Sequence, residues 1–384
     1  MPPGLSLMPP EIHLIAAARP NLPKLAALLH ALAEAPPFCT PVVVHTGQHH
    51  DAAMFGGHLA DLGLPAPEVA LGISGGGHAS LTGRTMMACA ELWSSRRPAL
   101  VVVAGDVDGT LAAALAARKL GIPVAHLEAG LRCRDLDMPE EINRRAVDAI
   151  STLLWAPDKA TASRLLADGH APDAVCAVGN TMIDSLLRAL PTARARKLPE
   201  GLEAGTYGVL TLHRPANVDS PTALAALLEA VAGAARQLPL AWPIHPRTSQ
   251  RLSEFGFALP AGVMPLPPLG YLDFLGLLSR ARMVATDSGG VQEEAWALNL
   301  PCLTLRPSTE RPVTLEAGTN RLLPAAGLPA AIAGILGGDR PRARPIPLWD
   351  GKAGARMVAH LAAFLGTGQA AASSRNSFAL ETVA

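Results

Sequence analysis

Short apolar runs alternate with helical stretches along most of this chain, and this alternation limits the folds that it can adopt. In the first half the predicted strands are Ile12–Ala17, Pro41–His45, Ala99–Ala104, Val124–Leu127, Leu153–Trp155 and Val175–Val178. The helical patterns between them include Leu22–Leu32, Thr110–Leu120 and Asn143–Ile150. A second series of predicted strands comprises Tyr207–Leu212, Ala241–His245, Gly262–Pro265, Met283–Thr286 and Cys302–Leu305. Such alternation predicts an α/β protein with parallel, doubly wound sheets.

The two series of strands predict two domains. Pro191–Gly205 is rich in Pro, Ala, Arg and Glu, which is typical of a linker. We therefore expect two Rossmann-like domains, at 1–190 and 206–345, with a cleft between the carboxyl ends of their strands. After Leu323 the pattern thins into Ala- and Pro-rich sequence. Gly354–Leu365 predicts a final helix within 346–366, and 367–384 a mobile polar tail.

Composition excludes several classes of protein. Hydrophobic residues make up 49% of the chain and aromatic residues only 4%, which suits a core of Ala, Leu and Val. The formal net charge is zero without long charged runs, so we expect neither a nucleic-acid nor a membrane partner. The scattered cysteines have no CxxC pair and predict buried thiols rather than disulfides or a zinc site. No apolar run is long enough to span a bilayer, and we expect a soluble, cytoplasmic protein.

The segment Thr286–Glu294 (TDSGGVQEE) carries the most specific functional pattern. It follows a predicted strand and opens a predicted helix. Ser288, Gly289 and Gly290 suit a phosphate cradle, because glycine allows close approach and free N–H groups at a helix start attract anions. Glu294, one turn further on, can accept two ribose hydroxyls. These residues predict a nucleotide site, with an ordinary, well-capped strand-to-helix turn as the alternative.

Polar residues also follow the predicted strands of the first domain. They are Arg19, Gln48, His49, His50, Asp106 and Glu128, together with Glu140 and Glu141 at a helix start. Carboxyl ends of parallel strands line one crevice, so we expect these side chains to converge there. Several carboxylates in one cleft repel, which predicts that one holds a proton near neutral pH, as proton abstraction and return require.

Each of these residues also has a structural interpretation. Glu140 and Glu141 suit the first turn of a helix behind Pro139. Arg132 could pair with Glu128, and His126 lies within an apolar strand, as a hydrogen-bonded core histidine does. No spacing of His, Cys and Asp predicts a metal site, and we expect no cofactor.

The second domain adds basic residues at its predicted strand ends. His213 and Arg214 follow the first strand, His245 follows the second, and Arg311 lies further on. Such groups can stabilise the charge of a departing nucleoside diphosphate. Arg247 is better explained as a surface arginine.

Several motifs together resemble one family. They are Thr46–His49, His126–Arg132, Met138–Arg144, Leu212–Pro215, Asp287–Gly290 with Glu293 and Glu294, Thr309–Pro312 and Glu316–Asn320. Over roughly Ile12 to Leu323 the chain is similar to the UDP-N-acetylglucosamine 2-epimerases, the non-hydrolysing bacterial type most of all. The resemblance implies the GT-B fold, a homodimer, and interconversion of UDP-GlcNAc and UDP-ManNAc without metal or NAD.

The resemblance also implies a mechanism. UDP leaves the anomeric carbon as a base removes the C2 proton, and UDP adds back to 2-acetamidoglucal with a proton on the opposite face. The candidate catalytic residues are Asp106, Glu128, Glu140 and His213. The candidate residues for binding UDP and sugar are Arg19, Gln48, His49, Arg132, Arg214, His245, Ser288, Gly289, Gly290, Glu294 and Arg311.

The chain departs from the family pattern at six positions near these motifs. They are Ala17, Ala18, Leu81, Asp108, Ala149 and Ala216. Leu81 replaces a Gln in the region where bacterial members bind a second, activating UDP-GlcNAc, so these departures bear on activation and on substrate choice.

Three functions therefore stand as hypotheses. The first is a non-hydrolysing 2-epimerase that supplies ManNAc for surface polysaccharide. The second is a related enzyme, either a hydrolysing epimerase that releases ManNAc and UDP or an epimerase for a modified UDP-sugar. The third is a catalytically weakened UDP-sugar-binding protein, which would have no need of three carboxylates and a histidine.

Overall fold

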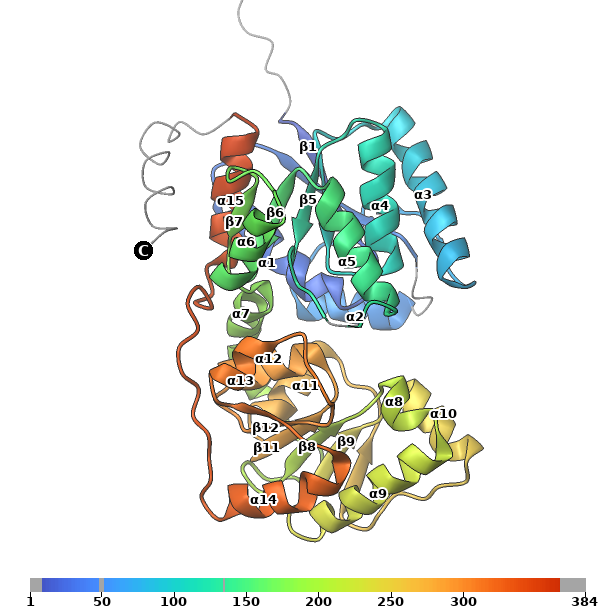
Figure 1. Ribbon diagram of the computed structural model, residues 1–384, viewed down its shortest axis with the longest axis vertical. Helices are drawn as coiled ribbons and strands as arrows, with labels where there is room; N and C mark the ends of the chain where they lie inside the picture. The colour runs from blue at the N-terminus through green and yellow to red at the C-terminus, as the bar shows by residue number, and fades with distance from the viewer. Residues whose placement is uncertain (1–8, 48–51, 134, 367–384) are drawn as a thin grey trace, which may run out of the picture. The chain divides into compact units, whose positions relative to one another are not determined.

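The computed structural model describes residues 9–47, 52–133 and 135–366. They form two compact units, coloured along the chain in Figure 1. Unit 1 takes its described residues from Met1–Asp184 and Pro347–Ala384, and unit 2 is Ser185–Ile346. The tail expected at 367–384 lies outside the described residues.

The described residues of unit 1 form a seven-stranded sheet in the order β3-β2-β1-β4-β5-β6-β7, with every pair of neighbours parallel. The strands are β1 (Glu11–Ala16), β2 (Thr40–His45), β3 (Val69–Ala70), β4 (Leu100–Ala104), β5 (Val124–Leu127), β6 (Leu153–Ala156) and β7 (Val175–Ala177). The strand order reverses between β1 and β4. In open α/β sheets, ligands bind beside the carboxyl ends of the strands at such a reversal.

The helices of unit 1 pack on this sheet through small apolar side chains. They are α1 (Asn21–Glu34), α2 (Ala52–Asp61), α3 (His78–Ser95), α4 (Asp108–Lys119), α5 (Pro139–Ile150), α6 (Lys159–Ala167), the start of α7 (Thr181–Ala195), and α15 (Ala353–Phe364). The core joins valines of β4 with alanines of α4. α15 lies against α1 (Figure 1), and a Cβ added at Gly354 would lie 2.3 Å from the carbonyl oxygen of Ala27.

Unit 2 repeats the same design with a six-stranded parallel sheet in the order β10-β9-β8-β11-β12-β13. Its strands are β8 (Gly208–Thr211), β9 (Leu240–Pro243), β10 (Val263–Leu266), β11 (Met283–Thr286), β12 (Cys302–Thr304) and β13 (Asn320–Leu322). Its helices are α8 (Pro215–Val218), α9 (Pro221–Ala235), α10 (Pro246–Glu254), α11 (Tyr271–Leu278), α12 (Gly289–Ala297), α13 (Pro312–Glu316), a 3₁₀ turn (Ala325–Gly327) and α14 (Leu328–Leu336). Here the strand order reverses between β8 and β11.

The linker predicted at Pro191–Gly205 is wrong. α7 continues through Pro191 to Ala195, and Leu198 and Leu202 pack against the core of unit 2. A Cβ added at Gly276 of α11 would lie 2.4 Å from the carbonyl oxygen of Ala193, so the end of α7 is in close contact with α11. Composition misled here because Ala and Arg are strong helix formers and the helix tolerates its proline.

Two strands and one α-helix lie where the sequence predicted neither a strand nor a helix. β3 and β13 are two and three residues long, too short to show a period. α14 forms in the Ala- and Pro-rich stretch, with Pro329 in its first turn, where a missing N–H costs little. Within the described ranges, no helix has the length and apolar character needed to cross a membrane.

Candidate functional site

Two candidate carboxylates lie at neighbouring strand ends of unit 1, and each is paired with a cation. Asp106 follows β4 and accepts hydrogen bonds from Nε and Nη2 of Arg144, at 2.9 and 2.5 Å. Glu128 follows β5 and lies 2.6 Å from Nζ of Lys24. The mutual repulsion expected from the sequence is therefore offset by one cation beside each carboxylate.

Glu128 also has an unusual backbone conformation. Its φ is +68°, in the left-handed region that side chains other than glycine rarely adopt, and the residue is buried. Strained conformations of this kind persist where the surrounding structure holds them, and they cluster at functional sites. The turn after β5 thus fixes where the Glu128 carboxylate points.

Glu140 and Glu141 behave differently although they are adjacent on α5. Glu141 is fully buried and accepts hydrogen bonds from Arg144, Arg145 and the backbone N–H of Cys133. Burial acts to raise the pKa of Glu141, but these hydrogen bonds together hold it below its usual value. Glu140 is half-buried, and no described residue forms an ion pair with it. Glu141 is thus structural, while Glu140 remains available for proton transfer.

A buried network connects the turns that follow β4 and β5. His126 is hydrogen-bonded through Nδ1 to Asp148 (2.7 Å) and through Nε2 to the carbonyl oxygen of Gly105 (2.9 Å), which confirms its prediction as a core histidine. Asp148 also accepts from the N–H of Gly130 and from Arg132, at 3.0 and 2.5 Å. Burial acts to raise the pKa of Asp148, but His126 and Arg132 lower it overall. The suggested Arg132–Glu128 pair is wrong, because Asp148 holds Arg132.

The turn that follows β1 is hydrogen-bonded to the end of β4, at the same edge of the sheet. The side chain of Asn21 accepts from the N–H of Ala18 (2.8 Å) and donates to the carbonyl oxygen of Ala104 at the end of β4 (2.9 Å). Arg19 lies in this turn and is half-buried. Gln48 and His49, expected beside it, lie outside the described residues.

The residues that depart from the family pattern differ in burial and in their hydrogen-bond partners. Ala17 and Leu81 are buried, whereas Ala149 and Ala216 are exposed. Asp108 accepts from His78 Nδ1 at 2.7 Å and from Asn143 Nδ2 at 3.2 Å. The negative charge introduced at Asp108 therefore has its own partner in His78.

In unit 2 one buried carboxylate organises the loop after β8. Asp287 accepts the backbone N–H groups of His213 and Arg214, the Nδ2 group of Asn217, and the Nδ1 group of His213 at 2.9 Å. Burial acts to raise the pKa of Asp287, but these donors lower it overall. With Nδ1 fixed on Asp287, the other ring nitrogen of His213 is left for a ligand. The His213 ring centre lies 5.3 Å from that of exposed His245.

The Ser-Gly-Gly turn forms the N-terminus of α12. Ser288 is the N-cap residue, but its side chain makes no capping hydrogen bond. The well-capped alternative is therefore wrong, and the first N–H groups of α12 remain available to an anion. A Cβ added at Gly289 would lie 2.6 Å from Oε1 of Glu310, so a larger residue there would displace the Glu310 carboxylate.

Glu294 is a buried carboxyl group without a protein partner. It is 4% exposed, and none of the described residues forms a hydrogen bond or ion pair with its side chain. Burial, together with the nearby charge of Glu293, raises its pKa to about 8. The buried hydroxyl of Tyr271, whose pKa is raised by burial and by the charge of Glu294, also has no hydrogen-bond partner. Such a pair of unsatisfied groups suits the hydroxyls of a ligand.

This raised pKa predicts a pH-dependent stability. Between its usual pKa of 4.5 and about 8, Glu294 is protonated in the folded protein but ionised in the unfolded chain. The resulting stability is complete below the lower value and declines toward the upper one, by up to about 1.4 kcal/mol per pH unit. We expect the melting temperature of ligand-free Glu294→Gln, relative to wild type, to rise between about pH 5 and pH 8.

The control for this prediction is Glu229→Gln, since Glu229 is exposed on α9. Its melting temperature relative to wild type should stay constant over the same range. A constant difference for Glu294→Gln would contradict the raised pKa.

Arginines surround the cradle, each beside a carboxylate. Arg311 Nε lies 2.7 Å from Glu293 Oε1, and Arg214 Nη2 lies 3.5 Å from Glu310 Oε1. Burial acts to raise the pKa of Glu310, but Arg311 and Arg306 bring it down to about 2. Nε of Arg214 is buried and has no hydrogen-bond partner, so this arginine retains a free donor for a ligand.

The structure adds residues that the sequence did not single out. Lys24 and Asn21 reach the site from α1, over separations of 104 and 83 residues, and no local pattern indicates them. Asp287 and Arg144 could have been predicted, because both lie within the quoted motifs. Asp287 is an acid directly after a strand, and Arg144 lies one helical turn after Glu140. Among the residues that the structure describes, no cluster of three His, Cys, Asp or Glu side chains could hold a metal ion.

Two doubly wound units, one with ion-paired carboxylates at its strand ends and one with a phosphate cradle, define an α/β enzyme of the GT-B type. The sequence model of the UDP-N-acetylglucosamine 2-epimerase family matches residues 30–362. The chain belongs to this family, which confirms the resemblance seen in the motifs.

Several relatives are similar over most of their length. A UDP-N-acetylglucosamine 2-epimerase from Methanococcus maripaludis is 38% identical over 81% of this chain and 87% of the relative. A UDP-2,3-diacetamido-2,3-dideoxy-D-glucuronate 2-epimerase from Pseudomonas aeruginosa is 39% identical over 82% of this chain and 89% of the relative. The crystal structure of Methanocaldococcus jannaschii UDP-GlcNAc 2-epimerase in complex with UDP-GlcNAc and UDP matches with a TM-score of 0.82 and 36% identity, over 92% of this chain and 99% of that one.

Proposed function

We propose that this enzyme interconverts UDP-GlcNAc and UDP-ManNAc by epimerisation at C2, without net hydrolysis. The observation that carries the proposal is Glu294, a buried, unpartnered carboxyl one turn behind an uncapped Ser-Gly-Gly helix start. Related solved structures contain UDP-GlcNAc, which supports a nucleotide sugar as the ligand.

Unit 2 provides the groups for UDP. The N–H groups of Gly289 and Gly290 and the hydroxyl of Ser288 bind the diphosphate, as helix starts bind anions. Glu294 accepts the ribose hydroxyls, which satisfies its buried oxygens. His213 and Arg214, both fixed by Asp287, stabilise the charge of the leaving UDP. Arg19, Gln48, His49, Arg132, His245 and Arg311 complete the proposed binding set.

Unit 1 provides the acids and bases. One carboxylate takes the C2 proton as the bond between the anomeric carbon and UDP breaks, which leaves 2-acetamidoglucal and UDP. A second group then protonates C2 from the opposite face as UDP adds back. Asp106 and Glu128 each lie beside a cation, Arg144 and Lys24, which offsets the charge of the carboxylate, so we assign the base to one of them. Glu140, which has no such partner, suits the acid.

Incubation with UDP-GlcNAc in deuterated water tests this function. We expect UDP-ManNAc to form, and deuterium to appear at C2 of both sugars, as followed by NMR. Free ManNAc with UDP would instead assign the hydrolysing reaction. UDP binding without exchange would contradict the epimerase and support the binding protein.

One observation favours a second candidate, an epimerase for a UDP-linked diacetamido uronate. The Pseudomonas relative that is named for this substrate is as similar to the chain as those named for UDP-GlcNAc. Parallel assays with the two UDP-sugars decide between them: the larger kcat/KM marks the substrate. The homodimer implied by the resemblance and the cytoplasmic location expected from the sequence remain predictions, and sedimentation of the purified protein tests the former.

A further inference from the structure

A cavity of about 590 Å³ lies in unit 2, away from the cradle. Its walls come from the turns before β11 and β12 and from the segment after α14. All three face the amino ends of the strands, whereas Asp287 and Ser288 follow a carboxyl end. β11 has four residues, so about 13 Å of strand separates the two ends. This cavity is therefore a separate feature from the candidate site.

Three arginines line the cavity: Arg282, Arg340 and Arg342. Within the described part of the chain, no carboxylate forms an ion pair with any of them. The one acid beside them in sequence, Asp339, is bound by Arg321 at 2.7 and 3.0 Å. The three positive charges are therefore uncompensated by the protein.

Arg282 carries a second, independent sign of a missing partner. Its Nε atom is buried and makes no hydrogen bond. A surface arginine with a solvated head group does not bury an unsatisfied donor, because that donor loses its water without gaining an acceptor. An anion within the cavity supplies the acceptor that the fold does not.

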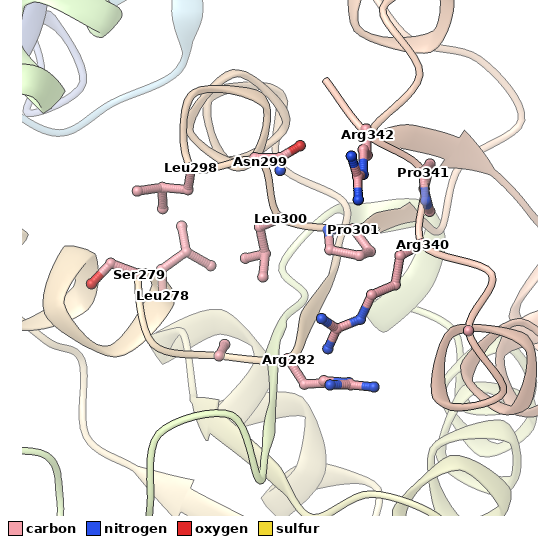
Figure 2. Close-up of a pocket in the computed structure, with 12 residues that line it drawn as sticks. Leu278, Ser279, Arg282, Leu298, Asn299, Leu300, Pro301, Arg340, Pro341 and Arg342 are labelled. Carbon is pink, nitrogen blue, oxygen red and sulfur yellow. The ribbon is translucent and has the colours of Figure 1, made fainter. Parts of the chain in front are cut away.

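The cavity is also held in shape by the protein. Asn299 has a φ of +51°, and its Oδ1 accepts the N–H of Ala343 at 2.8 Å. This bond joins the turn before β12 to the segment that bears Arg340 and Arg342. Figure 2 shows the three arginines on one side of the cavity and Leu278 and Leu298 on the other.

We propose that this cavity binds a phosphate-bearing small molecule. Guanidinium groups pair with phosphate through two parallel hydrogen bonds, and three of them suit a ligand with two or more negative charges. A volume of this size is typical of ligand pockets, and the leucines provide an apolar wall for the rest of the molecule.

Titration calorimetry with inorganic pyrophosphate tests the proposal, with saturating UDP present to fill the cradle at Ser288. We expect wild type to bind pyrophosphate in the millimolar range or tighter, and Arg340→Gln and Arg282→Gln each to weaken it by roughly ten- to a hundredfold. Arg340 is exposed, so its substitution leaves the fold intact.

Arg236→Gln is the matched control, because Arg236 is exposed at the end of α9 and does not line the cavity. It removes the same charge and should leave pyrophosphate affinity unchanged. Equal affinity of Arg340→Gln and Arg236→Gln, or absence of binding to wild type, overturns the proposal. If UDP does not bind, the same comparison without UDP decides the matter, so this site is tested independently of the proposed function.

Discussion

Asp106→Asn and Glu128→Gln should each lower kcat by about 10²- to 10⁴-fold, the contribution usual for a group that transfers a proton. Each substitution keeps the shape of the side chain and removes its ability to act as a base. We expect deuterium exchange at C2 to fall together with turnover, because both need the same proton transfer. Turnover measured by NMR and exchange in deuterated water give the two readouts.

The control is Asp173→Asn, the same chemical change at an exposed position of unit 1. It should keep wild-type turnover. Asp106→Asn also removes the ion pair with Arg144, and Glu128→Gln removes the ion pair with Lys24. The melting temperature of each variant must therefore be measured together with its turnover. Near wild-type turnover in either folded variant would show that its carboxylate is not needed for catalysis.

Asp287→Ala should cost about 3–5 kcal/mol of unfolding free energy and abolish UDP binding. Four donors from His213, Arg214 and Asn217 converge on this buried carboxylate, and alanine removes the acceptor that they share. The loop that carries His213 then loses its anchor. Urea unfolding and UDP titration measure the two effects.

Asp219→Ala provides the contrast. Asp219 pairs with Arg247 and Arg251 on the surface of unit 2, and such pairs contribute about 0–1 kcal/mol. The burial of the carboxylate, and not the number of its ion pairs, should decide how much unfolding free energy each substitution costs. A similar destabilisation by both substitutions would refute the anchoring role of Asp287.

The sequence predicted the sheets well because parallel strands are apolar on both faces. Val101 to Val103 of β4 are all fully buried, and such a run stands out against the polar turns around it. The elements it missed carry no such contrast: β3 has two residues, and α14 is too rich in Ala and Pro to show a clear face. Composition alone suggested a linker where Pro191 lies within a helix.

The candidate site was predicted only as far as strand ends and local motifs reach. Asp106 and Glu128 were predicted because they follow buried strands, and both lie at the carboxyl ends of those strands. Their partners Arg144 and Lys24 come from other elements, so one-dimensional spacing does not identify them. The missing Ser288 cap and the unsatisfied Arg282 likewise depend on the three-dimensional arrangement.

The return of the chain to unit 1 has a consequence for synthesis on the ribosome. Unit 2 is continuous, whereas α15 belongs to unit 1, where the N–H groups of Ala353 and Gly354 bind Asp184. A nascent chain therefore completes unit 2 before it can complete unit 1, the reverse of the usual order from the N-terminus. Until α15 emerges, the apolar face of α1 that it covers stays exposed, so the folding of unit 1 cannot be completed without α15.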